Sequence, residues 1–200
     1  PGKSDLWTLD LRFKDPRIIK VHVPGTGTRI YWYLWYQVIN RTGKPRTFIP
    51  VFELVTHDYP GTYLDQPLPA VLDAIRKVED PSNYLKIKDT FQISLNPIPA
   101  SKPAEEAFPI AVTGVAIWDA SPADVKHREP GVRDLSDTTQ FSIFVRGLSS
   151  GYVEVDPPAP GLPPLCARTD VAVTSRQSLQ RLERRPPVRL TEHAMQRGRL

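Results

Sequence analysis

The residues best suited to binding a ligand lie in the stretch IYWYLWYQVI, residues 30–39, which carries five aromatic side chains. Exposed rings on one face of a strand can stack on sugar rings, whereas buried rings fill the interior of a fold. Side chains alternate across a strand, so only one face could bind, and it would carry Tyr31, Tyr33 and Trp35. Apolar residues occupy both faces, as in a central strand covered on both sides. We therefore expect a buried core strand, and carbohydrate binding by these three exposed rings is the alternative.

The sequence GLSSG, residues 147–151, matches the G-x-S-x-G pattern that surrounds a catalytic serine, here Ser149. That chemistry requires a strand before the serine, a helix after it, and an acid and a histidine later in the chain. Residues 141–146 could form the strand, but the proline-rich residues 152–160 cannot form the helix. We therefore interpret GLSSG as a turn between strands.

The ionisable residues form no pattern that predicts a metal site. The histidines are scattered, and the nearest approach to a ligand set is His57 and Asp58 with Asp65, across one loop. A metal site in a soluble protein usually needs three or more converging ligands, held by further hydrogen bonds. We expect no metal, no cofactor, no catalytic residue, and a protein that is not an enzyme.

The net charge of +4 is concentrated at the end of the chain. Residues 161–200 carry eight Arg and three acidic residues, 8 − 3 = +5, which leaves 4 − 5 = −1 for residues 1–160. No aromatic residue follows Tyr152, so this region has little with which to build a core. Nucleic acid is not an expected partner, because the arginines are not interleaved with aromatic residues. The arginines expected to contact a partner protein are Arg181, Arg184, Arg185 and Arg189.

The pattern of apolar residues predicts strands, because it repeats every two residues between turns rich in Pro and Gly. The predicted strands are 7–13, 19–23, 30–39, 48–55, 87–95, 110–118, 141–147 and 152–155. Residues 30–39 and 48–55 are expected to pair as a ribbon across the turn NRTGKP. One helix is predicted over residues 68–79, ended by Asp80-Pro81. Its buried face would carry Val71, Leu72, Ile75 and Val78.

Three stretches resemble secreted proteins of an uncharacterised bacterial family of β-sandwiches. They are WYLWYQVINRTGKPRTFIPVFELVT, YLDQPLPAVLDAIRKVEDP and FSIFVRGLSSGY, and the resemblance covers about residues 5–155. It implies an extracytoplasmic location, that is periplasmic, cell-surface or secreted, and it transfers no function and no site residue. The chain begins with Pro1 rather than Met, so we expect a preceding segment, such as a signal peptide.

The predicted fold is all-β: an immunoglobulin-like antiparallel β-sandwich of about eight strands with one short connecting helix. Residues 1–156 would form the sandwich, 157–164 a Pro-rich linker, and 165–200 an Arg-rich extension that is disordered or ordered by a partner. No apolar run approaches the roughly 18 residues that span a bilayer. We predict a non-catalytic structural or protein-interaction module of an extracytoplasmic assembly. Its partner would be another protein, with polysaccharide as the alternative.

Overall fold

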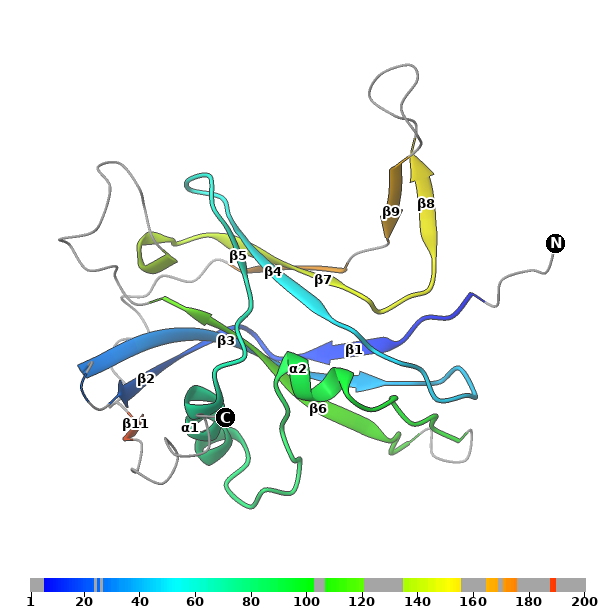
Figure 1. Cartoon of the computed structure of the whole chain (residues 1–200), viewed down its shortest axis with the longest axis horizontal. Helices are drawn as coiled ribbons and strands as arrows, with labels where there is room; N and C mark the ends of the chain where they lie inside the picture. Colours follow the sequence, from blue (N-terminus) through cyan, green and yellow to red (C-terminus); the bar gives the residue numbers. More distant parts are fainter. Residues whose placement is uncertain are drawn as a thin grey trace.

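The computed structural model is mostly β, with two main sheets, a two-stranded ribbon and two short helices among the residues it describes (Figure 1). The described residues are 6–23, 25, 27–102, 107–120, 135–155, 165–168, 171–175 and 188–189. The elements in chain order are β1 (Asp10–Phe13), β2 (Arg17–Val23), β3 (Gly27–Ile39), β4 (Val51–Thr56), β5 (Thr62–Leu64), α1 (Pro69–Glu79), α2 (Thr90–Ser94), β6 (Ala111–Asp119), the 3-10 turn η2 (Leu135–Asp137), β7 (Phe141–Arg146), β8 (Tyr152–Val155), β9 (Leu165–Arg168), β10 (Val171–Ser175) and β11 (Val188–Arg189).

The first sheet is built around β3, which has 13 residues and is paired along both edges. One edge pairs antiparallel with β6 from Tyr31 to Ile39. The other edge pairs with β2 and then with β1, which are separated by Asp15-Pro16. Proline lacks a backbone donor, so a break at this point interrupts the outer strand rather than the central one.

The second sheet has the order β10-β7-β4-β5 and packs against one face of the first. Trp32, Leu34 and Tyr36 of β3 point into the space between the sheets and are 0% exposed. The Trp32 ring meets Phe141 of β7 edge-on at 5.0 Å, and the Tyr36 ring lies 4.7 Å from Phe52 of β4. Burying a large apolar side chain stabilises a fold by about 1.5–3 kcal/mol, so this layer is a main source of stability. The predicted two-layer core is confirmed.

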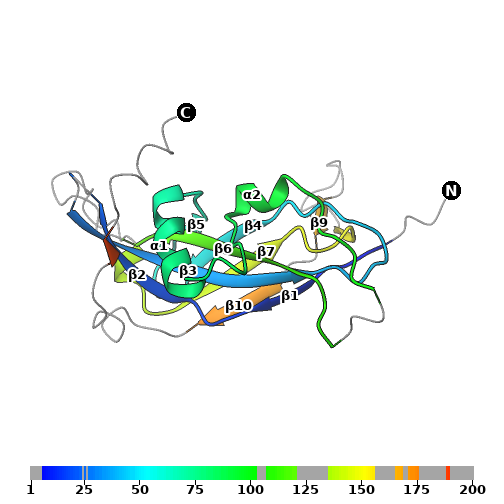
Figure 2. The same ribbon diagram turned by 90° about the horizontal axis from the view of Figure 1, so that it is seen from below.

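Helix α1 covers the opposite face of the first sheet, and Figure 2 shows α1 and α2 on the same side of it. Val71, Leu72 and Ile75 of the helix are buried against β3 and β6, as predicted. Val78, which was predicted on the buried face, is not buried; it is 47% exposed in the last turn of the helix. The central strand is therefore covered on both faces, by a sheet and by a helix.

The predicted ribbon between residues 30–39 and 48–55 is wrong. Both edges of β3 are already occupied, and β4 belongs to the second sheet, where it pairs with β5 and β7. The buried side chain of Asn40 fixes this crossing, because its amide donates to the carbonyl oxygens of Lys44 (2.7 Å) and Ile98 (2.9 Å). The turn therefore carries the chain between sheets instead of closing a hairpin.

The strand predicted over residues 87–95 is also wrong, because residues 90–94 form α2. The Asp89 carboxylate accepts a hydrogen bond from the N–H of Gln92 over 2.7 Å, which is a helix N-cap. Phe91 and Leu95 are exposed, and the buried residue of α2 is Ile93. Residues 91 and 95 also share one face of a helix, so their alternation with Ile93 did not distinguish a strand from a helix.

Three segments beyond residue 164 pair with strands of the body: β9 with β8, β10 with β7, and β11 with β2 in parallel. Parts of the predicted extension therefore lie along the sheets. The predicted linker, residues 157–164, lies outside the described residues.

Candidate interaction surface

The face considered as a sugar platform lies beneath α1. Tyr31, Tyr33 and Trp35 are 5%, 1% and 8% exposed. The Tyr33 hydroxyl donates to the Glu79 carboxylate over 2.8 Å, and the Lys14 ammonium lies 4.2 Å from the centre of the Trp35 ring. The three rings are therefore buried, as expected of a core strand. The alternative, in which they are exposed, is corrected, because a helix covers the surface on which a sugar would stack.

Ser149 lies in a turn after β7, in agreement with the interpretation of GLSSG. Its hydroxyl accepts a hydrogen bond from the N–H of Gly151 over 2.9 Å, and its backbone pairs with Thr8. Gly147 has φ of +96°, and a Cβ added there would lie 2.4 Å from the carbonyl oxygen of Ile49. The turn thus holds the N-terminal segment against the second sheet.

The three residues considered as metal ligands are not brought together. His57 Nε2 lies 2.7 Å from the Ser142 hydroxyl, the Asp58 carboxylate binds Thr138 and Thr139, and Asp65 accepts from Thr90. Among the described residues no group of three or more His, Cys, Asp or Glu side chains could hold a metal ion.

The contact between His57 and Ser142 is a pair that the sequence did not reveal. Ser142, the second residue of β7, is 4% exposed, so a substrate cannot reach its hydroxyl. The adjacent acid, Asp58, binds two threonines and does not orient the imidazole, as a catalytic acid would. The pair joins the end of β4 to β7.

A second polar group consists of Asp65, which accepts a hydrogen bond from Thr90, and Asp89, whose charges act on the buried hydroxyl of Tyr36. Burial raises the pKa of Asp65, against the hydrogen bond from Thr90. Burial, and then the charges of Asp65 and Asp89, raise the pKa of Tyr36, whose hydroxyl makes no hydrogen bond with any described residue. A Cβ added at Gly114 would lie 2.5 Å from that hydroxyl, so only glycine leaves room for the ring. This cluster holds α2 at the edge of the sandwich.

Glu79 fastens the last turn of α1 to the first sheet. Its side chain is 4% exposed and accepts from Lys14 (3.0 Å), Arg17 (2.7 Å) and Tyr33 (2.8 Å). Burial alone would raise the pKa of Glu79, but the hydrogen bonds from Lys14 and Tyr33 and the charge of Arg17 outweigh it and lower the pKa. The carboxylate is therefore ionised and fully engaged inside the fold.

Arg76 and Asp80 hold the loop that links α1 to α2. The Arg76 guanidinium donates to the Ile87 carbonyl oxygen (2.6 and 2.8 Å) and to the Gln92 side chain (3.2 Å). Asp80 is 5% exposed, and its carboxylate accepts from the N–H groups of Tyr84 (2.8 Å) and Lys86 (3.0 Å). The loop is therefore fixed from within by an arginine and a buried carboxylate.

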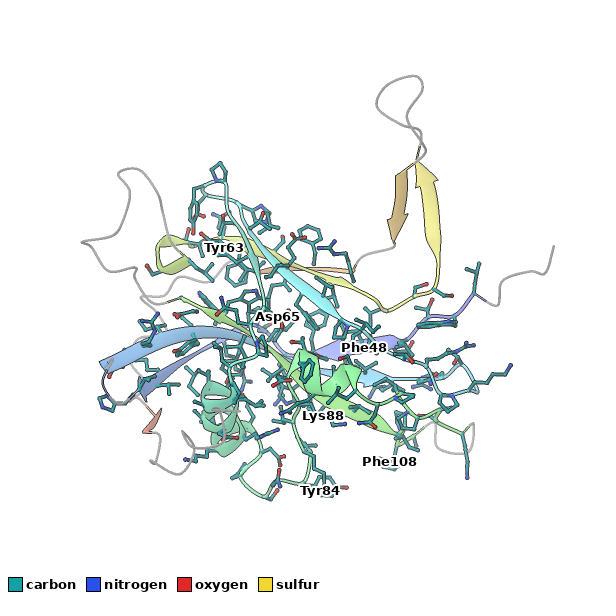
Figure 3. All side chains as sticks on the ribbon, in the orientation of Figure 1. Phe48, Tyr63, Asp65, Tyr84, Lys88 and Phe108 are labelled. Atoms are coloured by element: carbon teal, nitrogen blue, oxygen red, sulfur yellow. The ribbon has the colours of Figure 1, made fainter. Side chains whose placement is uncertain are left out.

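The same segment also exposes apolar and basic side chains. We call these the outer surface, and they are Lys77, Val78, Tyr84, Lys86, Phe91 and Leu95; the loop residues Pro81, Ser82 and Asn83 are exposed as well. Tyr84, Phe91 and Leu95 are 84%, 62% and 60% exposed. Figure 3 shows Tyr84 at the margin of the molecule, in the loop between the two helices. Neither lysine side chain is hydrogen-bonded or ion-paired with another of the described residues.

The sequence did not reveal the outer surface, because the prediction of a strand over 87–95 placed Phe91 on a half-buried sheet. Of the arginines expected to contact a partner, three lie outside the described residues, namely Arg181, Arg184 and Arg185. Arg189 is in β11, beside β2.

No family model, no curated protein and no solved structure matches the chain. The resemblance to a secreted bacterial family stays a prediction. None of the helices in the described part of the chain is both long and apolar enough to cross a bilayer.

Proposed function

We propose that the chain is a non-catalytic structural or protein-interaction module of an extracytoplasmic assembly, and that the outer surface contacts its partner. The observation that carries the proposal is the exposure of Tyr84, Phe91 and Leu95, together with the hydrogen bonds of Arg76 and Asp80 that hold the loop carrying Tyr84. Tyrosine and other aromatic side chains are enriched where proteins bind one another. A loop that is already ordered loses little entropy on binding, which favours affinity.

The polar clusters support this reading, because each is explained by a structural role. Glu79 fastens α1, Asp80 fixes the loop, and Asp65 with Asp89 holds α2. The location outside the cytoplasm rests on the resemblance of residues 5–155 to secreted proteins. The immunoglobulin-like form of the sandwich is supported by two sheets whose main strands pair antiparallel and enclose one core, and the strand order in a crystal structure tests it.

Crosslinking in the native source tests the proposal. An amine-reactive reagent applied to the full chain, followed by mass spectrometry, should join a partner protein to Lys77 or Lys86. Lys44, which is also exposed but lies in the turn between β3 and β4, serves as the internal control. Crosslinks that reach a partner only through Lys44 would place the contact elsewhere, and a chain that crosslinks to no protein would contradict the proposed function.

A further inference from the structure

The charged residues of the segment 76–95 are sorted by sign. Its bases are Arg76, Lys77, Lys86 and Lys88, and its acids are Glu79, Asp80 and Asp89. All three acids are buried, since the Glu79 side chain is 4% exposed and the two aspartates are 5% and 4% exposed. Each accepts hydrogen bonds from within the fold. The negative charges of the segment therefore lie inside it.

The positive charges remain at the surface. Lys77 and Lys86 are exposed and Lys88 is half-buried, whereas Arg76 is engaged with Asp73, Ile87 and Gln92. The nearest exposed acid on α1, Asp73, is thereby paired with an arginine. Among the exposed residues of this segment the charged ones are therefore cations, although its numbers of acids and bases are nearly equal.

The backbone that carries these side chains is held in an unusual conformation. Asn83 and Lys86 have φ of 55° and 50°, in the left-handed region that few residues other than glycine adopt. For a lysine such a conformation costs on the order of 1 kcal/mol or more, and it persists only where surrounding contacts impose it. The Asp80 carboxylate supplies them, because it binds the N–H of Lys86 directly. The backbone at Tyr84 and Lys86 is therefore held in one conformation before any partner arrives.

From these observations, and resting on the proposed function, we infer that the outer surface binds an acidic segment of a partner protein. The carboxylates of that segment would face Lys77 and Lys86, and an apolar side chain of it would pack against Tyr84 and Phe91. Charge complementarity speeds encounter and selects the partner, while a buried aromatic contact supplies most of the affinity.

A protein segment fits this surface better than a nucleic acid does. Single-stranded nucleic acids need a continuous positive groove with aromatic rings for successive bases. The outer surface has two exposed lysines and, besides Tyr84 and Phe91, the exposed aliphatic side chains Val78 and Leu95. Aliphatic groups pack against leucine or valine and gain little from a phosphate backbone. The mixed character therefore favours a peptide that alternates acidic and apolar residues.

The probe is a fluorescent peptide in which aspartate and leucine alternate, titrated with the full chain and followed by fluorescence anisotropy. Its controls are the same peptide with asparagine for aspartate, and a single-stranded DNA of similar length. The variants are Lys77→Glu with Lys86→Glu, and Tyr84→Ala. The matched controls are Lys44→Glu and Phe108→Ser; Phe108 is 90% exposed in a different loop from Tyr84 (Figure 3). Unchanged melting temperatures show that each variant folds.

The acidic peptide is expected to bind the parent chain. Tyr84→Ala should reduce its affinity about tenfold, since the loss of an aromatic anchor commonly reduces affinity by this factor, and the double lysine variant should reduce it by a similar factor. Neither control variant should change it. Raising the ionic strength from about 0.1 M to about 1 M shortens the Debye length from about 10 Å to about 3 Å and should weaken binding. Equal affinity for the neutral peptide, equal or tighter binding of the DNA, or no binding of the acidic peptide each overturns the inference.

The result is separable from that of the proposed function. A partner protein could crosslink to Lys77 or Lys86 but contact them without an acidic segment. That outcome would support the proposed function and contradict this inference.

Discussion

The inner and outer sides of the segment 76–95 use similar residues for opposite purposes. On the inner side, Arg76, Glu79 and Asp80 are each held by at least two hydrogen bonds. On the outer side, Lys77 and Lys86 make no such contact with the described residues. The sign and burial of each charge therefore distinguish the residues that hold the loop from the residues that can bind a partner. The amino-acid composition of the segment does not. Changes on the inner side should therefore cost stability, and changes on the outer side should cost binding.

The largest expected effect is that of Glu79→Ala. The substitution leaves the Tyr33 hydroxyl without an acceptor and two cations without their counter-ion. The free energy of unfolding should therefore fall by about 2 kcal/mol. The loss stays below that of a wholly buried pair, because Lys14 and Arg17 are 39% and 40% exposed. Urea denaturation checks this, with Lys77→Ala on the same helix as the control. A loss no greater than that of the control would break the comparison between the two sides.

Asp80→Ala should have the next largest effect, about 1–2 kcal/mol, because it removes the acceptor of two backbone N–H groups. The amides of Tyr84 and Lys86 should then exchange with solvent faster than in the parent chain, which hydrogen exchange with mass spectrometry measures. Binding of the acidic peptide should also weaken, since the loop is no longer held in one conformation. Unchanged exchange at both amides would show that the carboxylate does not fix the loop.

The buried carboxylates should respond to pH in opposite directions. Contacts lower the pKa of Glu79 in the fold, so its contribution is present above its unfolded pKa and is lost as pH falls through the folded value. Burial raises the pKa of Asp65, so the folded state holds that proton longer and stability falls as pH rises from the unfolded value to the folded one.

Glu79→Gln and Asp65→Asn separate these two contributions. Urea midpoints measured between about pH 3 and pH 7 should show that Glu79→Gln costs more stability at the upper end of the range. The stability of Asp65→Asn relative to the parent chain should instead increase as pH rises. If both variants changed with pH in the same direction, one of the two assigned environments would be wrong.

The smallest effects on stability are expected on the outer side. Lys77→Glu, Tyr84→Ala and Phe91→Ser should each change the free energy of unfolding by no more than about 0.5 kcal/mol, as exposed substitutions usually do. The same variants should weaken peptide binding, which anisotropy measures. A large loss of stability for Tyr84→Ala would mean that this ring supports the fold and is not held for a partner.

Most of the fold follows from local pattern. Alternation along residues 30–39 correctly assigned Trp32 to the core between the sheets, because a strand has a strict period of two. The spacing of Val71, Leu72 and Ile75 predicted α1 for the same kind of reason. What failed depends on distant parts of the chain. Strand β3 pairs with β6 instead of β4, and the paired residues of β3 and β6 are more than seventy positions apart in the chain.

The outer surface could not be predicted for a related reason. Glu79 binds Lys14 and Arg17, which lie more than sixty residues earlier in the chain. These contacts remove the negative charge of Glu79 from the surface. The sequence shows the acids and bases of 76–95 side by side. In the fold, packing of α1 on the sheet buries the Glu79 side chain, and local backbone N–H groups engage Asp80 and Asp89. Conversely, the burial of Tyr31, Tyr33 and Trp35 under α1 removed a surface that the sequence alone had left open.

Site-specific photo-crosslinking in the native source tests most directly whether the segment between the two helices is where this molecule meets another. Benzoylphenylalanine would replace Tyr84 in one full-length variant and Phe108 in another. Irradiation should yield a covalent adduct with one protein from position 84 and not from position 108. An adduct formed from position 108 alone would contradict the assignment of the binding surface.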